Sequence, residues 1–267
     1  MDIYGREKAW GERHPLRRWG YLLLGELHIP GRLRIWHIIR QLKRLGLWQR
    51  RSLSVLDAGG GEGAFAYYLA RRFPGWKIVI VDDSEAALSR GREIQSRLGL
   101  RNLELRRADL TLLDETDQYD LIICSDVLEH IQADDLVVQS LARALKPSGM
   151  VVITSPSVPQ PKHLSLVAWR EKRIGFSLQD YGHVRQGYSA ARLQELLEKA
   201  GLTVKRVSWT FGKFGTLMFD LFFVTGDSRP NPVVYAALFP LYIALSALDV
   251  CFPPSHGAAI LGVGEKP

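Results

Sequence analysis

The sequence predicts an α/β protein with a doubly wound, mostly parallel seven-stranded sheet, a basic N-terminal helical extension and a hydrophobic helical insertion before the last strand. From Leu53 onward, short apolar runs alternate with helical patterns, as is typical of βαβ units. These runs are continuously apolar, which indicates strands that helices cover on both faces. A composition of 46% hydrophobic and 24% charged residues excludes disordered and fibrous classes.

The expected elements follow one another in a regular order. Strands are expected at 53–56, 78–81, 103–105, 121–124, 151–154, 203–209 and 258–263, and helices at 64–72, 85–98, 134–145 and 190–199. The last of these helices begins after Ser189, a favourable N-cap, and ends at Gly201. Residues 52–210 and 258–267 are therefore expected to form one domain, with 1–51 as the extension and 211–257 as the insertion.

The net charge of +7 is concentrated in the extension. Residues 1–51 contain twelve Lys and Arg against four acidic residues, and the rest of the chain carries a net charge of −1. Residues 32–48 are expected to form an amphipathic helix whose apolar stripe includes Leu33, Trp36 and Ile39. A basic helix of this kind can lie in a membrane interface. The alternative is a helix that packs on the sheet or caps the active site.

The insertion contains two apolar stretches, 214–225 and 233–248, and the second has no formal charge. If 258–263 returns to the sheet, the insertion leaves and re-enters on one side of any membrane, which excludes a single span. Two spans would need about twenty apolar residues each. The insertion is then expected to form either a shallow hairpin that lies on the bilayer or a hydrophobic cover over an apolar substrate channel. The alternatives are a homo-oligomer interface and an ordinary extension of the core.

Cysteine usage and the first residues favour a cytoplasmic protein. Cys124 and Cys251 are too few for a disulfide framework or a Cys-only metal site. The basic first twenty residues lack the apolar run of a secretory signal. Nucleic acid is not an expected partner, because no aromatic-basic RNA-binding motif accompanies the positive charge.

Residues 55–63, Val-Leu-Asp-Ala-Gly-Gly-Gly-Glu-Gly, carry the strongest chemical signal. A buried strand ends in Asp57, and a glycine-rich turn then opens a helix, so the backbone can approach a ligand closely. Gly59, Gly61 and Ala64 also satisfy the dinucleotide pattern G-x-G-x-x-G/A, which leaves a nicotinamide or flavin nucleotide open on the glycines alone. Asp57 favours a cationic ligand over a pyrophosphate. S-adenosylmethionine is such a ligand, since it carries an ammonium and a sulfonium.

At this point the chain resembles the class I S-adenosylmethionine-dependent methyltransferases, which have a Rossmann-like fold. The family's D-x-G-x-G-x-G motif matches at Asp57, Gly59, Gly61 and Gly63. Four further segments resemble the family's motifs in order: 80–84, 108–110, 119–125 and 145–149. The resemblance implies S-adenosylmethionine as cofactor. It also implies Asp82 at the ribose hydroxyls, an acid near the adenine amine at Asp109, and further cofactor-binding positions at Asp83, Leu110 and Ser125.

Residues after the fourth expected strand could hold a divalent metal. Asp126, Glu129 and His130 are spaced i, i+3 and i+4, so they would share a face if this segment is helical. His183 could add a fourth ligand from a distant loop. The set resembles the E-x-x-E-H metal site of small-RNA 2′-O-methyltransferases and ubiquinone-pathway O-methyltransferases, with Asp in place of the first Glu. The alternative is that Glu-His after the fourth strand is common in this fold without any metal.

The loop 156–188 is expected over the carboxyl ends of the strands, where open α/β sheets bind ligands. His183 in this loop is the favoured general base, because its ordinary pKa is near neutrality. His130 and Tyr188 are the other candidate catalytic residues. The alternative for His183 is a structural or lid-anchoring role.

These features together predict a methyltransferase of a hydrophobic or membrane-resident acceptor such as a lipid or an isoprenoid quinone. It is expected to be cytoplasmic and peripherally bound to an anionic membrane surface, at the inner face. One alternative is a methyltransferase of a soluble small molecule whose insertion forms a dimer interface. Another is a non-catalytic, nucleotide-binding, membrane-associated module.

Overall fold

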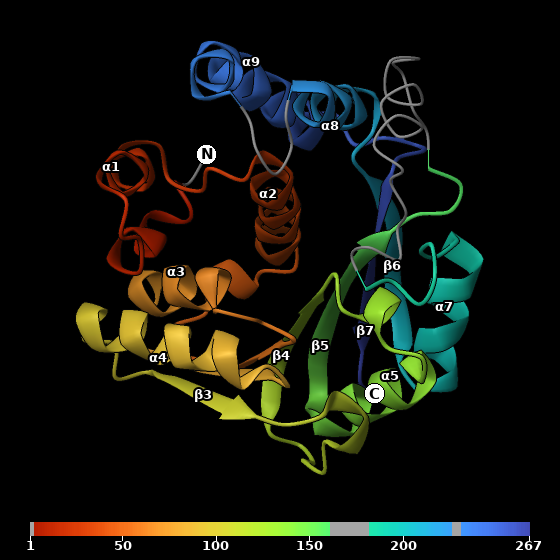
Figure 1. Ribbon diagram of the computed structural model, residues 1–267. Coiled ribbons are helices and arrows are strands. Elements are labelled where there is room, and N and C mark those ends of the chain that lie inside the picture. The colour runs from red at the N-terminus through yellow and green to blue at the C-terminus, as the bar shows by residue number, and fades with distance from the viewer. Residues whose placement is uncertain (1–2, 161–181, 226–230) are drawn as a thin grey trace.

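The computed structural model describes residues 3–160, 182–225 and 231–267, which contain a seven-stranded mixed sheet (Figure 1). The strands are β1 Ser54–Ala58, β2 Lys77–Asp82, β3 Leu103–Arg107, β4 Tyr119–Ser125, β5 Leu145–Pro156, β6 Thr203–Thr210 and β7 Ala259–Glu265. Their order is β3-β2-β1-β4-β5-β7-β6. Strands β1 to β5 are parallel, and β7 runs antiparallel between β5 and β6. The predicted fold class and the return of the chain after the insertion are confirmed.

Helices cover both faces of the sheet, as the continuously apolar strands predicted. Helices α3 Ala64–Arg72 and α4 Glu85–Leu98 lie on one face, and α5 Asp134–Ala144 and α7 Ala190–Lys199 lie on the other. One core cluster joins the sheet to α3 and α4, and a second joins it to α5 and α7. Strand order reverses between β1 and β4, and open sheets bind ligands at such a switch point.

The extension contains two helices, α1 Pro15–Leu24 and α2 Ile29–Arg44, with the short turns η1 Arg6–Trp10 and η2 Leu47–Gln49. The expected helix at 32–48 therefore begins three residues earlier and ends four residues earlier. His28 caps α2 by accepting a hydrogen bond from the Gly31 N–H, and Pro30 is tolerated in the first turn. The apolar stripe of α2 is buried: Ile38 and Leu42 pack in the sheet core, and Leu33 packs against the insertion. Of the two roles left open for this helix, the structure supports the packed one.

The insertion forms two helices, α8 Lys213–Thr225 and α9 Pro232–Cys251, which pack on each other and on α2. Their shared core includes Phe222, Phe239 and Tyr242. In the buried interior of this layer, His37 Nε2 of α2 lies 2.9 Å from Asp249 Oδ2 of α9. Figure 1 shows α8 and α9 outermost, beyond α2.

Among the described residues, one helical segment, Val233–Cys251, is long and apolar enough to cross a membrane. Its mean hydropathy is 1.9, and a third of it is buried inside the protein. The strands before and after the insertion, β6 and β7, are neighbours in one sheet. The chain therefore leaves the sheet and returns to it on the same side, which does not fit a single crossing.

Candidate functional site

The glycine-rich turn between β1 and α3 is built on left-handed backbone conformations. Gly59, Gly61 and Gly63 have φ angles of 72°, 56° and 84°, which residues with a Cβ rarely adopt. A Cβ on Gly59 would lie 2.4 Å from Val127, and one on Gly63 would lie 2.3 Å from Ile80. A Cβ on Gly61 would meet no atom within 4 Å. The turn is therefore packed against protein on two sides and open above Gly61.

Two carboxylates lie beside this turn at the ends of β1 and β2. Asp57 is buried, and burial together with the charge of Asp82 raises its pKa to about 7. Asp82 accepts hydrogen bonds from the Gly61 N–H at 2.8 Å and from the Ser84 N–H at 2.9 Å. Because a carboxylate can accept about four hydrogen bonds, Asp82 keeps capacity for a ligand's hydroxyl groups.

The other predicted cofactor-binding residues also lie at the carboxyl ends of strands. Asp83 is exposed directly after β2. Asp109 accepts hydrogen bonds from the Thr111 N–H and hydroxyl, which lower its pKa, and Leu110 beside it is buried. Ser125 ends β4, and its Oγ lies 2.8 Å from Thr154 Oγ1 of β5. The structure thus places the predicted residues along one edge of the sheet.

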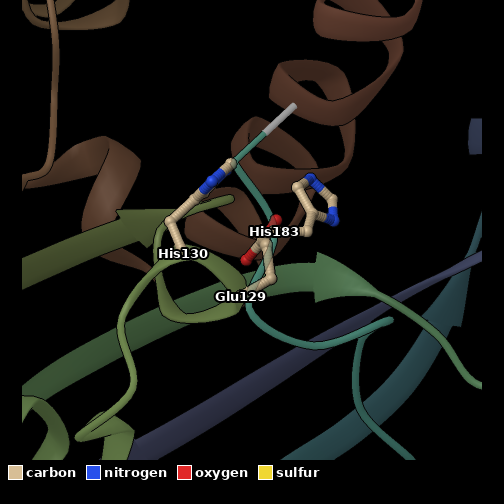
Figure 2. Close-up of side chains that lie close together, drawn as sticks. All are labelled: Glu129, His130 and His183. Carbon is tan, nitrogen blue, oxygen red and sulfur yellow. The ribbon is translucent and has the colours of Figure 1, made fainter. Parts of the chain in front are cut away.

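A second cluster follows β4 and joins it to the loop before α7. Each of Glu129, His130 and His183 can offer one ligand atom such that these atoms lie within 4.8 Å of one another. The rings of His130 and His183 have their centroids 4.6 Å apart. Figure 2 shows the Glu129 carboxylate between the two imidazoles. Residues 161–181 of the predicted loop 156–188 lie outside the described residues.

Glu129 is fully buried in this cluster. Its Oε2 accepts a hydrogen bond of 3.0 Å from Ser155 Oγ, whereas Oε1 has no hydrogen-bond partner among the described residues. Burial and the charge of Asp126 raise its pKa to about 7. Burial and His130 lower the pKa of His183. Both shifts follow from the burial of each group and from the ionisable neighbour beside it.

The structure does not bring Asp126 into the cluster with the other three predicted metal ligands. The segment after β4 is a short 3-10 turn, Leu128–His130, and Asp126 precedes it with a φ of 56°. Asp126 forms an ion pair with Arg34 of α2 instead. The sequence spacing could not reveal the separation of Asp126 from the cluster, because the i, i+3, i+4 argument holds only if residues 126–130 are helical.

The loop that carries His183 is anchored by Arg185 and Tyr188. Arg185 donates hydrogen bonds to the carbonyls of Leu128, Ile131 and Gln132. The Tyr188 hydroxyl donates to Asp134 at 2.8 Å, and the Tyr188 ring is 1% exposed. The predicted catalytic residue Tyr188 therefore lies where it positions the loop, away from solvent and tied to a carboxylate.

Sequence reasoning missed Arg34 and Tyr4. Arg34 reaches Asp126 from α2 and lies over the Phe211 ring at 5.8 Å. Tyr4 is buried against Phe65 and Tyr68, and this burial, together with the charges of Glu26 and Asp57, raises its pKa. Nothing in the local sequence pattern marks either residue, because both act across long separations in the chain.

Comparisons with known proteins agree with this geometry. A family model described as "Methyltransferase domain" matches residues 31–207, about two thirds of the chain. The chain belongs to the class I S-adenosylmethionine-dependent methyltransferases. The predicted enzyme class and cofactor are confirmed by this membership.

Several curated methyltransferases are similar to this one. A ubiquinone biosynthesis O-methyltransferase of Acinetobacter baumannii (strain AYE) is 25% identical over 156 residues, covering 58% of this chain and 65% of the relative. The chain thus spans slightly less than two thirds of that relative's length. A ubiquinone biosynthesis O-methyltransferase of Rickettsia prowazekii is 22% identical, with coverage of 68% and 71%. The (S)-coclaurine N-methyltransferase of Thalictrum flavum is 27% identical over 100 residues, 38% of this chain and 28% of the relative.

Solved structures share the methyltransferase fold. A structure described as a sarcosine dimethylglycine methyltransferase from Galdieria sulphuraria has a TM-score of 0.58 and 20% identity, and the match covers 94% of this chain and 97% of that chain. Phosphoethanolamine N-methyltransferase 2 of Haemonchus contortus, solved with S-adenosyl-L-methionine, has a TM-score of 0.53 and 19% identity. That match covers 81% of this chain and 49% of the other.

The cofactor site of this methyltransferase fits S-adenosylmethionine. Open space above Gly61 admits a ligand, Asp57 offers a negative charge to a cation, and Asp82 keeps acceptor capacity for hydroxyl groups. The second cluster offers one carboxylate and two imidazoles, donors that suit a borderline divalent cation. Oε1 of Glu129, which no described residue hydrogen-bonds, also fits a cation, because a buried carboxylate oxygen is costly to leave without a partner.

Proposed function

We propose that this methyltransferase methylates a hydroxyl group of a hydrophobic, membrane-resident acceptor, such as a lipid or an isoprenoid quinone, at the Glu129–His130–His183 cluster. The observation that carries the proposal is the convergence of a buried carboxylate and two imidazoles at the end of β4. This cluster lies beyond the strand that adjoins the glycine-rich turn, as β4 pairs with β1. This pairing supports a proton acceptor next to the cofactor site.

When bound, S-adenosylmethionine supplies an activated methyl group. The chain's own task is to hold the acceptor oxygen in line and remove its proton. His183 suits the second role, because its lowered pKa keeps the imidazole unprotonated at neutral pH. His130 packs against it, and Glu129 lies within reach of both rings. In the version with a metal, Glu129, His130 and His183 would hold the cation, and a bound metal lowers the pKa of an oxygen ligand.

The apolar layer above the cluster supports a hydrophobic acceptor. Arg34 and Phe211 connect this layer to Asp126, next to the cluster. Helices α2, α8 and α9 supply its core, in which Leu33, Met218 and Tyr242 are buried. The names of the Acinetobacter and Rickettsia relatives, ubiquinone biosynthesis O-methyltransferases, support a phenolic hydroxyl on a lipid-soluble acceptor.

A methyl-transfer assay with S-adenosylmethionine labelled in its methyl group tests the proposal. Two catechols that differ only in a prenyl tail, presented in detergent micelles, should be methylated at different rates, with the prenylated one preferred. The labelled product should be an ether that resists acid. Methylation of neither catechol, with efficient transfer to an amine such as phosphoethanolamine, would overturn the proposal.

Equal rates for both catechols would favour the alternative of a soluble acceptor. The similarity to (S)-coclaurine N-methyltransferase is the observation that supports this alternative. In that case the apolar insertion would serve dimerisation, and the protein would sediment as a dimer without lipid.

We also propose that the protein works at the cytoplasmic face of a membrane, on an anionic lipid surface. Two features support this placement. The basic residues gather in the extension, and both cysteines, Cys124 and Cys251, are free. A membrane-resident acceptor would also have to be met at such a surface.

A further inference from the structure

The polarity of helix α9 is inverted relative to an ordinary surface helix. Its buried side chains include Ser246, 0% exposed, and Asp249, 1% exposed. Every exposed residue of its described part is apolar or cysteine: Val233, Val234, Ala236, Ala237, Pro240, Leu241, Ala244, Leu248 and Cys251. A surface helix facing water normally shows the opposite arrangement. The outer face of α9 is therefore composed like a surface that contacts hydrocarbon.

The apolar residues of this face form one stripe. Val233, Leu241 and Leu248 are 75%, 43% and 38% exposed, and successive members are eight and then seven residues apart, about two helical turns. Phe252, directly after the helix, extends the stripe and is 63% exposed. Isolated exposed leucines need no explanation, but a continuous apolar stripe over five turns marks an interaction surface.

Helix α1 carries a second exposed apolar stripe. Of its ten residues, all of them described, Tyr21 alone is buried. Leu16, Trp19 and Leu23, spaced i, i+3 and i+7, are 77%, 62% and 66% exposed. Arg17 and Arg18 lie between them and are exposed as well. Exposed leucines and a tryptophan flanked by arginines are the composition of a helix that lies in a membrane interface.

The two helices are joined where α1 ends and α9 begins. The Tyr235 hydroxyl of α9 donates a hydrogen bond to the carbonyl of Leu27, in the link between α1 and α2. Arg32 of α2 donates to the carbonyl of Leu24, the last residue of α1, and lies over the Phe239 ring of α9 at 5.6 Å. These contacts link the end of α1 to α9, on the helical side of the molecule away from the sheet.

We propose that the exposed stripes of α1 and α9 together form a membrane-docking face, which inserts into the interfacial region of an anionic bilayer. The inference rests on the proposed function and names the surface through which the enzyme meets its lipid-soluble acceptor. Charge complementarity selects the occupant: Arg13, Arg17 and Arg18 accompany the α1 stripe, and no acidic side chain is exposed on α1 or on the described part of α9. The basic helix α2 is excluded from the face, because its apolar stripe is already buried.

Vesicle sedimentation tests the docking face. Vesicles of phosphatidylglycerol and phosphatidylcholine, mixed with the full chain, should pellet it at low salt, and high salt should weaken but not abolish this. Leu16→Gln/Leu23→Gln and Leu241→Gln/Leu248→Gln should each lower partitioning about tenfold, since each removes two large apolar side chains from the contact. Leu136→Gln, on α5 at the other face of the sheet, is the matched control, because Leu136 is 47% exposed. It should bind like the wild type.

A fluorescent label gives a second readout that does not depend on the folding of the variants. Cys251 lies exposed at the end of the α9 stripe, and the other cysteine, Cys124, is fully buried. An environment-sensitive fluorophore on Cys251 should shift to the blue and brighten when vesicles are added. The same fluorophore on Cys251→Ser/Gln139→Cys, where residue 139 is exposed on α5, should not respond.

The outcomes separate this inference from the proposed function. Vesicle binding that survives both leucine pairs, with no response at Cys251, would overturn the docking face whatever the enzyme methylates. A second result would also overturn it. If the wild type sediments as a dimer in lipid-free buffer and Leu241→Gln/Leu248→Gln sediments as a monomer, the face binds a second copy of the chain. Transfer to a prenylated catechol in detergent reports on the proposed function and does not require the docking face.

Discussion

The guanidinium of Arg34, on α2, forms an ion pair with the carboxylate of Asp126, which directly follows β4. Each side chain is 23% exposed. Burial raises the pKa of Asp126, and the Arg34 charge opposes that shift. The pair joins the N-terminal extension to the residue three positions before Glu129. The extension thereby reaches the segment that carries the candidate site and is not only an attachment to the sheet.

Replacing Arg34 should destabilise the protein and reduce its activity. Arg34→Met leaves the Asp126 carboxylate half-buried without its counter-ion, which should cost about 1–3 kcal/mol of unfolding free energy. Denaturant unfolding measures this cost, and methyl transfer should fall because Asp126 and the turn after it lose their position. Arg44→Met removes the same charge from an exposed site on the same helix and should change neither quantity. Equal effects of the two substitutions would show that the ion pair contributes nothing specific.

The sheet could be predicted from the sequence, and the candidate cofactor site could be located, because their signals are local. Asp57 and the three glycines at 59, 61 and 63 stand within seven residues, and each has a backbone or charge requirement that its neighbours reveal. The acid Asp82 is found in the same way, since it ends the apolar run of β2, whereas Asp109 follows two arginines and is indicated by the family resemblance. Patterns of this kind can be recognised in one sequence without any structure.

The helical layer could be predicted only in part, because its contacts join distant segments. The apolar stripe of α2 was visible, but its burial depends on α9, some two hundred residues later, through pairs such as His37 and Asp249. Helix α1 has only ten residues and begins at Pro15, so its periodicity is too short to stand out. Asp126 lies outside a helix, with its N–H bonded to the Thr154 carbonyl and its carboxylate paired with Arg34, and no local spacing contains either contact.

His183→Asn should lower kcat by about 10²–10⁴ while leaving S-adenosylhomocysteine affinity unchanged, because the imidazole removes a proton and does not hold the cofactor. Single-turnover kinetics and calorimetry measure the two quantities. Tyr188→Phe is the matched variant in the same loop. Its lost hydrogen bond to Asp134 should lower stability by about 1 kcal/mol and change kcat far less. An equal loss of kcat in both variants would indicate that His183 only anchors the loop.

A divalent cation should bind at Glu129, His130 and His183, and Mn²⁺ is the probe. Mn²⁺ should raise the unfolding temperature of the wild type, because binding to the folded state adds stability. Glu129→Gln should abolish that increase, since Oε1 of Glu129 is a buried oxygen of the cluster that no described residue hydrogen-bonds. Asp126→Asn should retain the increase, because Asp126 lies outside the cluster and pairs with Arg34. If Mn²⁺ raises the unfolding temperature of Glu129→Gln as much as that of the wild type, the metal does not bind at this cluster.

S-adenosylmethionine should bind more weakly as the pH falls below about 7, and Asp57 should be the cause. Burial and the charge of Asp82 raise the pKa of Asp57 to about 7 from an ordinary value of 3.8, so the apo protein holds a proton there in acid. A cationic ligand favours the ionised carboxylate, and its affinity should therefore fall by up to about tenfold per pH unit below 7. Asp57→Asn should bind weakly at every pH between 6 and 8, without this dependence.

The free energy of unfolding of the apo protein should fall as the pH rises, because of the same carboxylate, whereas cofactor affinity should rise with pH. Because its folded pKa lies above its unfolded value, the Asp57 contribution to stability is fully present below about pH 4 and is lost as the pH rises through about 7. Asp57→Asn should therefore gain unfolding free energy relative to the wild type as the pH is raised from 5 to 8, measured in denaturant without cofactor. Parallel curves for the two proteins would show that Asp57 ionises normally. The pH dependence of cofactor binding would then have to come from another group.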